Sequence, residues 1–332
     1  MTELAVHDGL RPRRLVSIVV PALNEFDNVP AVLARMVDLG VAHPGYDFEL
    51  VLVDDGSSDG TADRAIADAP PGVPVTVVQL SRSFGSHQAI TAGLRRTSGA
   101  CAIVLGADIQ EPPELITEFL TNWEQGSDVV WGVRRTRVRS WRSELPSRLF
   151  SYLFTKYADL ADYPPEGPSG MLVDRAVLDE LNRLEESNRN VMALVAWLGF
   201  HQTRVLYDQL PRQHGETRWT RRKMVKLAVD SLVQFSSMPL RACTFTGLGV
   251  AALGLVYAIA LTVRGLLGVA TPSGWPTILV VVLVLGGIQL MVIGVMGEYL
   301  WRAVEETRRR PLYVVRGVTH SRRVVADTGD RK

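Results

Sequence analysis

Residues 53–61 read Val53-Asp54-Asp55-Gly56-Ser57-Ser58-Asp59-Gly60-Thr61, and this stretch decides the fold class. It follows the apolar run Leu50–Val53 and precedes a helical pattern that Ser58 or Asp59 can cap. A short β-branched run, a turn rich in Asp, Ser and Gly, and then a helix make the first half of a parallel βαβ unit. The stretch therefore predicts an α/β fold with a Rossmann-like, mainly parallel sheet.

The same alternation extends outward from Leu15 to about Gly132. Strands are expected at Val16–Val20, Leu50–Val53, Val75–Leu80, Ala102–Leu105 and Val129–Trp131. Helices are expected to begin near Asp27, Asp59, Gly85 and Pro112. In such sheets ligands bind beyond the carboxyl ends of the strands, so the residues that follow each strand are the candidates for chemistry.

The residues that follow the expected strands are unusually polar. They include Asn24 and Glu25, Asp54 and Asp55, and Asp108 and Gln110. Acidic groups that converge on one edge repel one another unless a cation or a donor-rich ligand lies among them. Plainer interpretations stay open: Asp54 and Asp55 as helix caps, Asp108 as a turn residue, and Glu25 as a complement to a helix dipole. No GxGxxG turn and no P-loop sequence occurs, which disfavours a dehydrogenase-type dinucleotide site.

Composition excludes several classes of protein. The chain has 332 residues, with 36 Lys and Arg against 35 Asp and Glu, so a uniformly basic nucleic-acid binder is not expected. Hydrophobic residues make up 47%, which permits a sizeable core. The two cysteines, Cys101 and Cys243, lie far apart in apolar surroundings and indicate neither a disulfide framework nor a thiolate metal site.

Two long uncharged stretches lie in the last third of the chain, Ala242–Val263 and Trp275–Gly297. Each is long enough to cross the hydrocarbon core of a bilayer, which takes about 20 apolar residues in a helix. A short connection with Pro272 and Gly274 separates them, which favours a transmembrane hairpin over residues 242–300. The alternative is a pair of buried helices in a soluble core. Glycines in both stretches allow close helix contact, so a homo-oligomer is expected.

The charge distribution predicts an orientation. Residues 1–211 carry a net charge of −9, whereas 212–241 and 300–332 carry +5 each. The positive-inside rule then assigns both basic flanks, and with them both chain ends, to the cytoplasm. Residues 1–14 are expected to be a flexible terminus without a secretion signal, 15–211 the α/β domain, and 301–332 a basic tail. Residues 212–241 combine a basic loop with an amphipathic pattern, which indicates an interfacial helix or an ordinary surface helix.

Three segments carry a resemblance to a known family. They are Val19 to Glu25, Val53 to Thr61, and Asp108-Ile109-Gln110-Glu111-Pro112-Pro113. In this order they resemble the inverting GT-A glycosyltransferases of family 2. Residues 81–93 and the ending Gly297-Glu298-Tyr299-Leu300 make the chain similar to the polyprenyl-phosphate branch, which includes the dolichol-phosphate mannose synthases, over residues 15–316.

The resemblance implies roles for individual residues. The nucleotide-sugar positions are matched by Pro21, Asn24, Glu25, Asp54 and Asp55, with Arg212 and Arg218 from a basic loop that closes over the donor. Asp108 and Gln110 match the ligands of a divalent cation, Mg or Mn, and Arg134 matches a phosphate-side arginine. Arg134 could equally lie on a solvated basic face, and Arg212 and Arg218 could simply contact the membrane surface.

The sequence departs from the family pattern in three places. Gly106 stands where the metal motif usually begins with an Asp, Ser169 where an Asp sometimes assigned as catalytic base is typical, and Met171 where an Arg is usual. Ser169 is kept as a catalytic candidate with Asp108 and Arg134. The QxxRW segment of processive synthases is absent, which disfavours polymer synthesis.

The resemblance implies an integral-membrane enzyme that transfers a sugar, with inversion, from a nucleotide-diphosphate sugar to a polyprenyl phosphate at the cytoplasmic face. A nucleoside diphosphate leaving group develops negative charge, which a cation and Arg side chains stabilise. The departures keep a second hypothesis open, a catalytically silent membrane subunit that binds nucleotide sugar or a partner protein.

Overall fold

The computed structural model describes residues 13–135, 163–164, 167–186, 189–211, 238–267 and 274–321. These residues fall into two compact units. The first unit holds residues 13–135, 163–164, 167–186, 189–211 and 311–321, and the second holds 238–267 and 274–310. The predicted basic loop and amphipathic helix of 212–241 lie almost wholly outside the described residues, as do residues 1–12.

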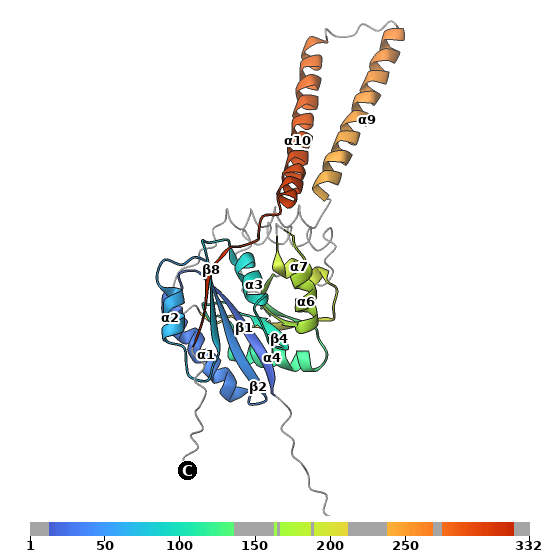
Figure 1. Ribbon diagram of the computed structural model, residues 1–332. Helices are drawn as coiled ribbons and strands as arrows, with labels where there is room; N and C mark the ends of the chain where they lie inside the picture. The colour runs from blue at the N-terminus through green and yellow to red at the C-terminus, as the bar shows by residue number, and fades with distance from the viewer. Residues whose placement is uncertain are drawn as a thin grey trace, which may run out of the picture. The chain divides into compact units, whose positions relative to one another are not determined.

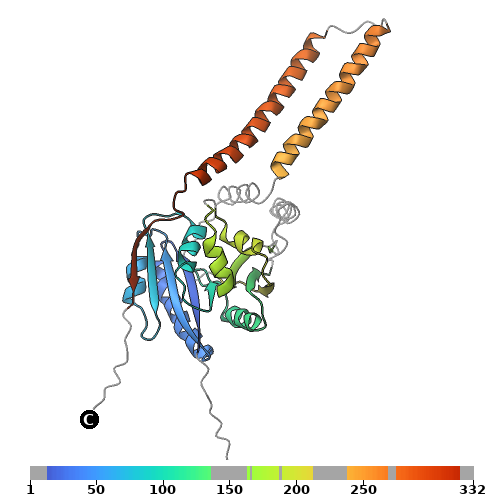
Figure 2. The same ribbon diagram turned by 45° about the vertical axis from the view of Figure 1, so that its right-hand side comes forward.

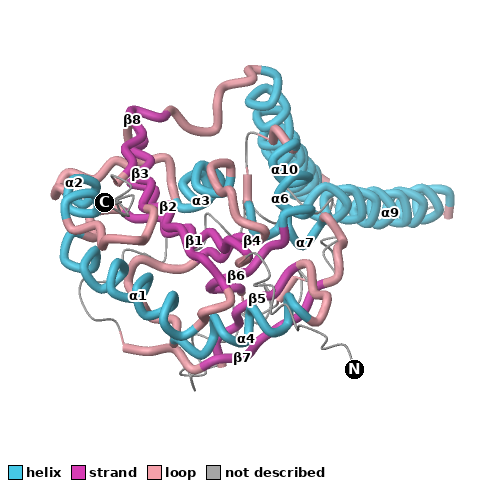
Figure 3. The backbone as a smooth tube through the Cα atoms, turned by 60° about the horizontal axis from the view of Figure 1, so that its bottom comes forward, coloured by secondary structure: helices cyan, strands magenta, loops and turns pink. Residues whose placement is uncertain are grey.

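The first unit is built on one sheet (Figure 1). Its described strands run in the order β7-β5-β6-β4-β1-β2-β3-β8 (Figure 3). The strands are β1 (Arg14–Ala22), β2 (Tyr46–Asp54), β3 (Val75–Leu80), β4 (Cys101–Val104), β5 (Val129–Arg134), β6 (Pro168–Asp174), β7 (Gln202–Tyr207) and β8 (Val315–His320). β1 pairs in parallel with β2 and β4, β2 with β3, and β5 with β7. β6 and β8 pair antiparallel with their neighbours, so the sheet is mixed. All five predicted strands are confirmed as β1 to β5.

Helices cover both faces of this sheet (Figure 3). One face carries α1 (Val29–Ala42), α2 (Thr61–Ala67) and α4 (Pro113–Glu124), and the other carries α3 (Ser86–Leu94), α6 (Arg175–Arg183) and α7 (Val191–Trp197). A 3-10 turn, η1 (Phe26–Asn28), leads into α1. The predicted helix starts are confirmed within about two residues, and Pro113 occupies the first turn of α4 as expected. Asp59 accepts hydrogen bonds from the Thr61 N–H at 3.0 Å and the Thr61 hydroxyl at 2.6 Å, although Gly60 is the formal cap of α2.

The central strands are buried on both faces because helices cover both. Val16, Ile18 and Val20 of β1 pack into the core with α1 and α4, while Val19 faces α3. Such strands are continuous apolar runs rather than alternating ones. At Gly93 of α3, a Cβ atom would lie 2.4 Å from a methyl carbon of Val19 and 3.0 Å from one of Val53, so only glycine lets this helix approach the sheet so closely.

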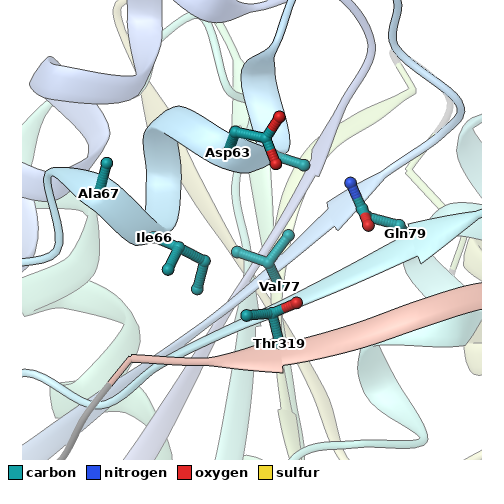
Figure 4. Close-up of a pocket in the computed structure, with 7 residues that line it drawn as sticks. Asp63, Ile66, Ala67, Val77, Gln79 and Thr319 are labelled. Atoms are coloured by element: carbon teal, nitrogen blue, oxygen red, sulfur yellow. The ribbon is translucent and has the colours of Figure 1, made fainter.

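The last strand returns the chain from the second unit to the sheet of the first. Strand β8 pairs antiparallel with β3, from Thr76 opposite His320 to Leu80 opposite Val315, and forms the sheet edge (Figure 2). A pocket at this end of the sheet is lined by Asp63 and Ile66 of α2, Gln79 of β3 and Thr319 of β8 (Figure 4). The sequence predicts only a basic tail over residues 301–332, whereas Val315–His320 of this segment form a strand of the sheet.

The second unit consists of two long helices, α9 (Met238–Leu266) and α10 (Trp275–Thr307), which contact each other. Among the described helices, one segment, Val284–Thr307, is long and apolar enough to cross a membrane by length and composition. The apolar segment of α9, Cys243–Tyr257, is shorter than Val284–Thr307 of α10. The structure therefore supports one of the two predicted membrane spans by length and composition and does not confirm the second.

Candidate active site

Strand pairing brings the predicted site residues to one edge of the sheet. β1 lies between β2 and β4 and runs parallel to both, so the segments that follow these three strands leave the sheet on the same side. β5 and β7 end at that edge too, and the antiparallel β6 begins there, opposite the end of β5. The edge therefore collects Asn24, Asp54, Asp108, Arg134 and Ser169.

The adjacent acids after β2 have different surroundings, although each is only 4% exposed. Asp54 Oδ1 accepts one hydrogen bond, from the Ser57 N–H at 2.8 Å. Asp55 accepts three, from the Ser83 hydroxyl at 2.8 Å, the Phe84 N–H at 2.7 Å and the Gly85 N–H at 3.0 Å. Neither carboxylate caps α2, so the plainer interpretation of this pair is wrong. Asp55 instead fixes the segment that follows β3.

Gly56 makes this attachment possible. Its φ is +79°, and a Cβ atom would lie 2.6 Å from the carbonyl carbon of Arg82 and 2.7 Å from the backbone nitrogen of Ser83. The backbone after β2 and the backbone after β3 are therefore in direct contact. Asp55 and Gly56 of the 53–61 stretch therefore serve a contact between two loops as well as a turn.

The segment after β1 is tied to the same stretch. Asn24 has a φ of +50°, in the left-handed region that Asn tolerates, and its N–H donates to the Ser57 hydroxyl at 2.8 Å. Its side-chain oxygen accepts from the Ser58 N–H at 2.8 Å. The Glu25 N–H donates to the Thr61 hydroxyl at 3.0 Å, and the Glu25 carboxylate accepts from the Asn28 amide at 2.6 Å at the start of η1. Pro21, the second-last residue of β1, lies opposite Val53 of β2.

The loop after β4 brings two carboxylates together over Gly106. A Cβ atom on Gly106 would lie 2.7 Å from Asp108 Oδ1 and 3.5 Å and 3.7 Å from the two carboxylate oxygens of Glu111. Glu111 is 4% exposed, and its Oε2 has no hydrogen-bond partner in the part of the chain that the structure describes. Burial and the nearby Asp108 charge raise the pKa of Glu111 to about 7, against backbone hydrogen bonds and Arg35, which lower it.

Between these acids, Ile109 has a φ of +51°. A β-branched residue in the left-handed region is strained by about 1–2 kcal/mol. Strain of this kind persists only where the surrounding structure fixes the backbone, and Ile109 is buried among core residues. The loop that carries Asp108 and Gln110 is therefore held in one conformation by packing.

Gln110 links this loop to the segment after β7. Its Oε1 accepts from the Gln209 amide at 2.7 Å, and its backbone carbonyl accepts from the Leu210 N–H at 2.9 Å. The Arg134 guanidinium, exposed at the end of β5, donates to Gln209 Oε1 at 3.3 Å. Arg134, Gln209 and Gln110 thus form a chain of contacts along the site edge.

Ser169 sits in a hydrogen-bonded position between three strands. Its hydroxyl donates to the Gly132 carbonyl at 3.1 Å and lies 2.6 Å from the Tyr207 hydroxyl. Because a carbonyl only accepts, these two bonds together require the Tyr207 O–H to donate to Ser169. Burial raises the pKa of Tyr207, the charges of Glu111 and Asp108 also raise it, and the charge of Arg134 lowers it. Tyr207 is thus within electrostatic range of the loop after β4 and of the end of β5.

Sequence reasoning misses three residues of this edge: Glu111, Tyr207 and Gln209. Tyr207 and Gln209 end and follow β7, so the rule that chemistry follows the strands would have found them had β7 been predicted. Glu111 lies within the segment Asp108 to Pro113, but nothing in that segment distinguishes it as a site residue. Its place in the site depends on the space above Gly106, which only the structure shows. Arg212 and Arg218 lie outside the described residues, so their donor-binding role stays a prediction.

The described residues supply two carboxylates for a hard cation but not a complete set of protein ligands. No group of three or more His, Cys, Asp and Glu side chains is arranged to hold a metal within the described ranges. Two carboxylates do converge over Gly106, and one of their oxygens is buried without a partner. Carboxylate oxygens are the ligands that Mg²⁺ prefers, usually one or two from the protein beside substrate phosphates. The residues therefore fit a cation that shares its coordination with a diphosphate.

Comparisons with known proteins agree with this architecture. The family described as glycosyl transferase family 2 matches residues 17–182. An uncharacterized glycosyltransferase of Synechocystis sp. is 36% identical over 90% of this chain and 94% of its own. The undecaprenyl-phosphate 4-deoxy-4-formamido-L-arabinose transferase of Pseudomonas fluorescens is 33% identical over 93% of this chain and 92% of its own. The bactoprenol glucosyl transferase of Shigella phage SfV is 30% identical over 91% of this chain and 98% of its own. The chain belongs to glycosyl transferase family 2.

Proposed function

We propose that this protein transfers a sugar, with inversion, from a nucleotide-diphosphate sugar to a polyprenyl phosphate at the cytoplasmic face of a membrane. The observation that carries the proposal is similarity over more than nine-tenths of the chain to transferases named for undecaprenyl-phosphate and bactoprenol. That similarity extends well beyond residues 17–182 of the family match and so includes helical segments outside the sheet. It favours transfer over the silent-subunit alternative.

In this proposal the donor occupies the edge where β1, β2 and β4 end. Pro21, Asn24, Glu25 and Asp54 line the nucleotide, and Asp55 acts through the loop that it holds. Arg134 contacts the diphosphate from the end of β5, and Arg212 and Arg218 close over it. A divalent cation bound beside Asp108 would neutralise the charge that develops on the departing diphosphate.

The acceptor makes a general base unnecessary. A phosphate monoester has a second pKa near 6, so its oxygen is anionic at neutral pH and can attack the anomeric carbon directly. The bond to the diphosphate breaks on the opposite face as the new bond forms, which inverts the anomeric centre. Ser169, whose hydroxyl is committed to Gly132 and Tyr207, then orders the site and takes no proton.

The second unit supports a membrane location. Most large apolar side chains described in α9 and α10 are exposed, with Phe245 at 71%, Leu253 at 73% and Leu290 at 72%, which a bilayer would cover. We infer that both helices span the membrane, that both chain ends are cytoplasmic, and that residues 212–241 lie at the interface. A Cβ atom on Gly247, Gly254 or Gly287 would meet nothing within 4 Å, which leaves these positions open to another copy of the hairpin.

A donor panel tests the proposal. Membranes containing the protein are incubated with labelled nucleotide sugars and polyprenyl phosphate, with Mg²⁺ or Mn²⁺ present or chelated. The expected product is organic-extractable, labile to mild acid and dependent on the cation. Binding of a donor without any lipid product would instead support the silent-subunit alternative.

A further inference from the structure

We propose that Glu111 is a ligand of the divalent cation and that, with Asp108, it forms a two-carboxylate site over Gly106. The inference deepens the function proposed above and rests on it for the identity of the cation's other partner, a diphosphate. It assigns a metal-binding role to a residue outside the Asp108 and Gln110 pair that the sequence predicts.

The first support is geometric. Asp108 Oδ1 and both Glu111 carboxylate oxygens lie within 3.7 Å of one point, the position a Cβ atom would take on Gly106. The φ of Gly106 is not in the left-handed region, so the backbone does not require glycine here. What glycine provides at this position is room for two carboxylates to approach each other.

The second support is the state of the Glu111 side chain. A carboxylate that is 4% exposed and has one oxygen without a hydrogen-bond partner among the described residues is costly to bury. A second carboxylate close by adds repulsion, which a cation between them would turn into attraction. Arg35 lies near enough to interact with this charge, but its guanidinium donates to the Glu111 backbone carbonyl at 2.5 Å.

Gln110 is less available than Glu111 for the same task. The Gln110 side-chain oxygen already accepts from the Gln209 amide at 2.7 Å, whereas Glu111 Oε2 has no partner. An anionic oxygen also binds a hard cation more strongly than an amide oxygen does. The structure thus points to Glu111 as the second protein oxygen.

Mn²⁺ binding to the full-length protein, measured by the loss of the free-ion electron paramagnetic resonance signal without nucleotide sugar or lipid, tests this assignment. Glu111→Gln and Asp108→Asn are each expected to weaken Mn²⁺ binding by about tenfold or more. Glu114→Gln, which changes an exposed acid one turn further on, is the matched control and is expected to bind as wild type does. Thermal unfolding in a chelator checks that each variant is folded.

A double variant adds a readout that a purely structural role would not move. Gly106→Asp combined with Glu111→Ala is expected to regain Mn²⁺ binding, because truncation of Glu111 leaves space above Gly106 that the new carboxylate can enter. Wild-type Mn²⁺ affinity in Glu111→Gln would overturn the inference, as would absence of saturable binding to the wild type at millimolar Mn²⁺, or a folded double variant that binds no Mn²⁺. Failure of lipid transfer with these Mn²⁺ results intact would instead count against the proposed function alone.

Discussion

At the scale of single residues, the two adjacent acids after β2 do different work. Asp55→Asn would turn an amide N–H₂ toward one of three donors, so it is expected to lower the free energy of unfolding by about 2–3 kcal/mol. Asp54→Asn keeps an oxygen for the Ser57 N–H, so it is expected to lower the free energy of unfolding by less than about 1 kcal/mol. The same change is expected to weaken binding of the nucleotide sugar. Denaturant unfolding and nucleotide-sugar titration of the same samples separate the two effects, and equal losses of stability would contradict this division.

The burial of His87 is expected to make the free energy of unfolding depend on pH. Burial lowers the pKa of His87 to about 4 from 6.5, and its Nδ1 has no hydrogen-bond partner. Between these values the unfolded imidazole binds a proton that the folded one does not, so stability is lost as the pH falls from about 6.5 to 4. In His87→Leu the midpoint of thermal unfolding is expected to fall less between pH 6.5 and pH 4 than it does in the wild type. His201→Leu, at an exposed position, is the control, and identical pH profiles for all three proteins would refute the assignment.

At the scale of secondary-structure elements, α3 packs tightly against the sheet at Gly93. Gly93→Ala places a methyl group against Val19 and Val53 and is expected to destabilise the protein by about 1–3 kcal/mol, despite the better helix propensity of alanine. Gly40→Ala in α1 is the matched control, since a Cβ there meets nothing within 4 Å, and it is expected to stabilise by about 0.5–1 kcal/mol. Chemical denaturation measures both, and a Gly93→Ala protein as stable as wild type would contradict the packing described.

Elements with strong local signals could be predicted from sequence, and those without could not. β1 to β5 are apolar runs flanked by turn residues, so their positions follow from pattern alone. β6 begins with Pro168, Ser169 and Gly170, which indicate a turn, and β8 is a half-exposed edge strand with Gly317 inside it. Asp54, Asp55 and Asp108 follow from the strand-end rule, and Tyr207 would follow from it once β7 is known. The position of Glu111 over Gly106 depends on tertiary contacts that spacing does not encode.

At the scale of the whole molecule, the chain leaves the sheet after β7 and returns to it as β8 after the two long helices. Ending the chain at Arg310 would leave the outer edge of β3 unpaired, from Thr76 to Leu80. We expect faster amide hydrogen exchange in β3 and a greater tendency to aggregate, with little change in β1 or β4. Hydrogen exchange read by mass spectrometry on the full and shortened chains measures this, and unchanged protection of β3 would show that β8 is dispensable.

The most direct test of the account is the rate of sugar transfer to polyprenyl phosphate by the full-length protein in lipid nanodiscs, for Asp108→Asn beside a matched control. The control is Asp47→Asn, which removes an exposed acid paired with Arg13 at 3.4 Å at the opposite edge of the sheet. The account predicts wild-type transfer for Asp47→Asn and a loss of about a hundredfold or more for Asp108→Asn, with both proteins folded. Undiminished transfer by Asp108→Asn would contradict the account.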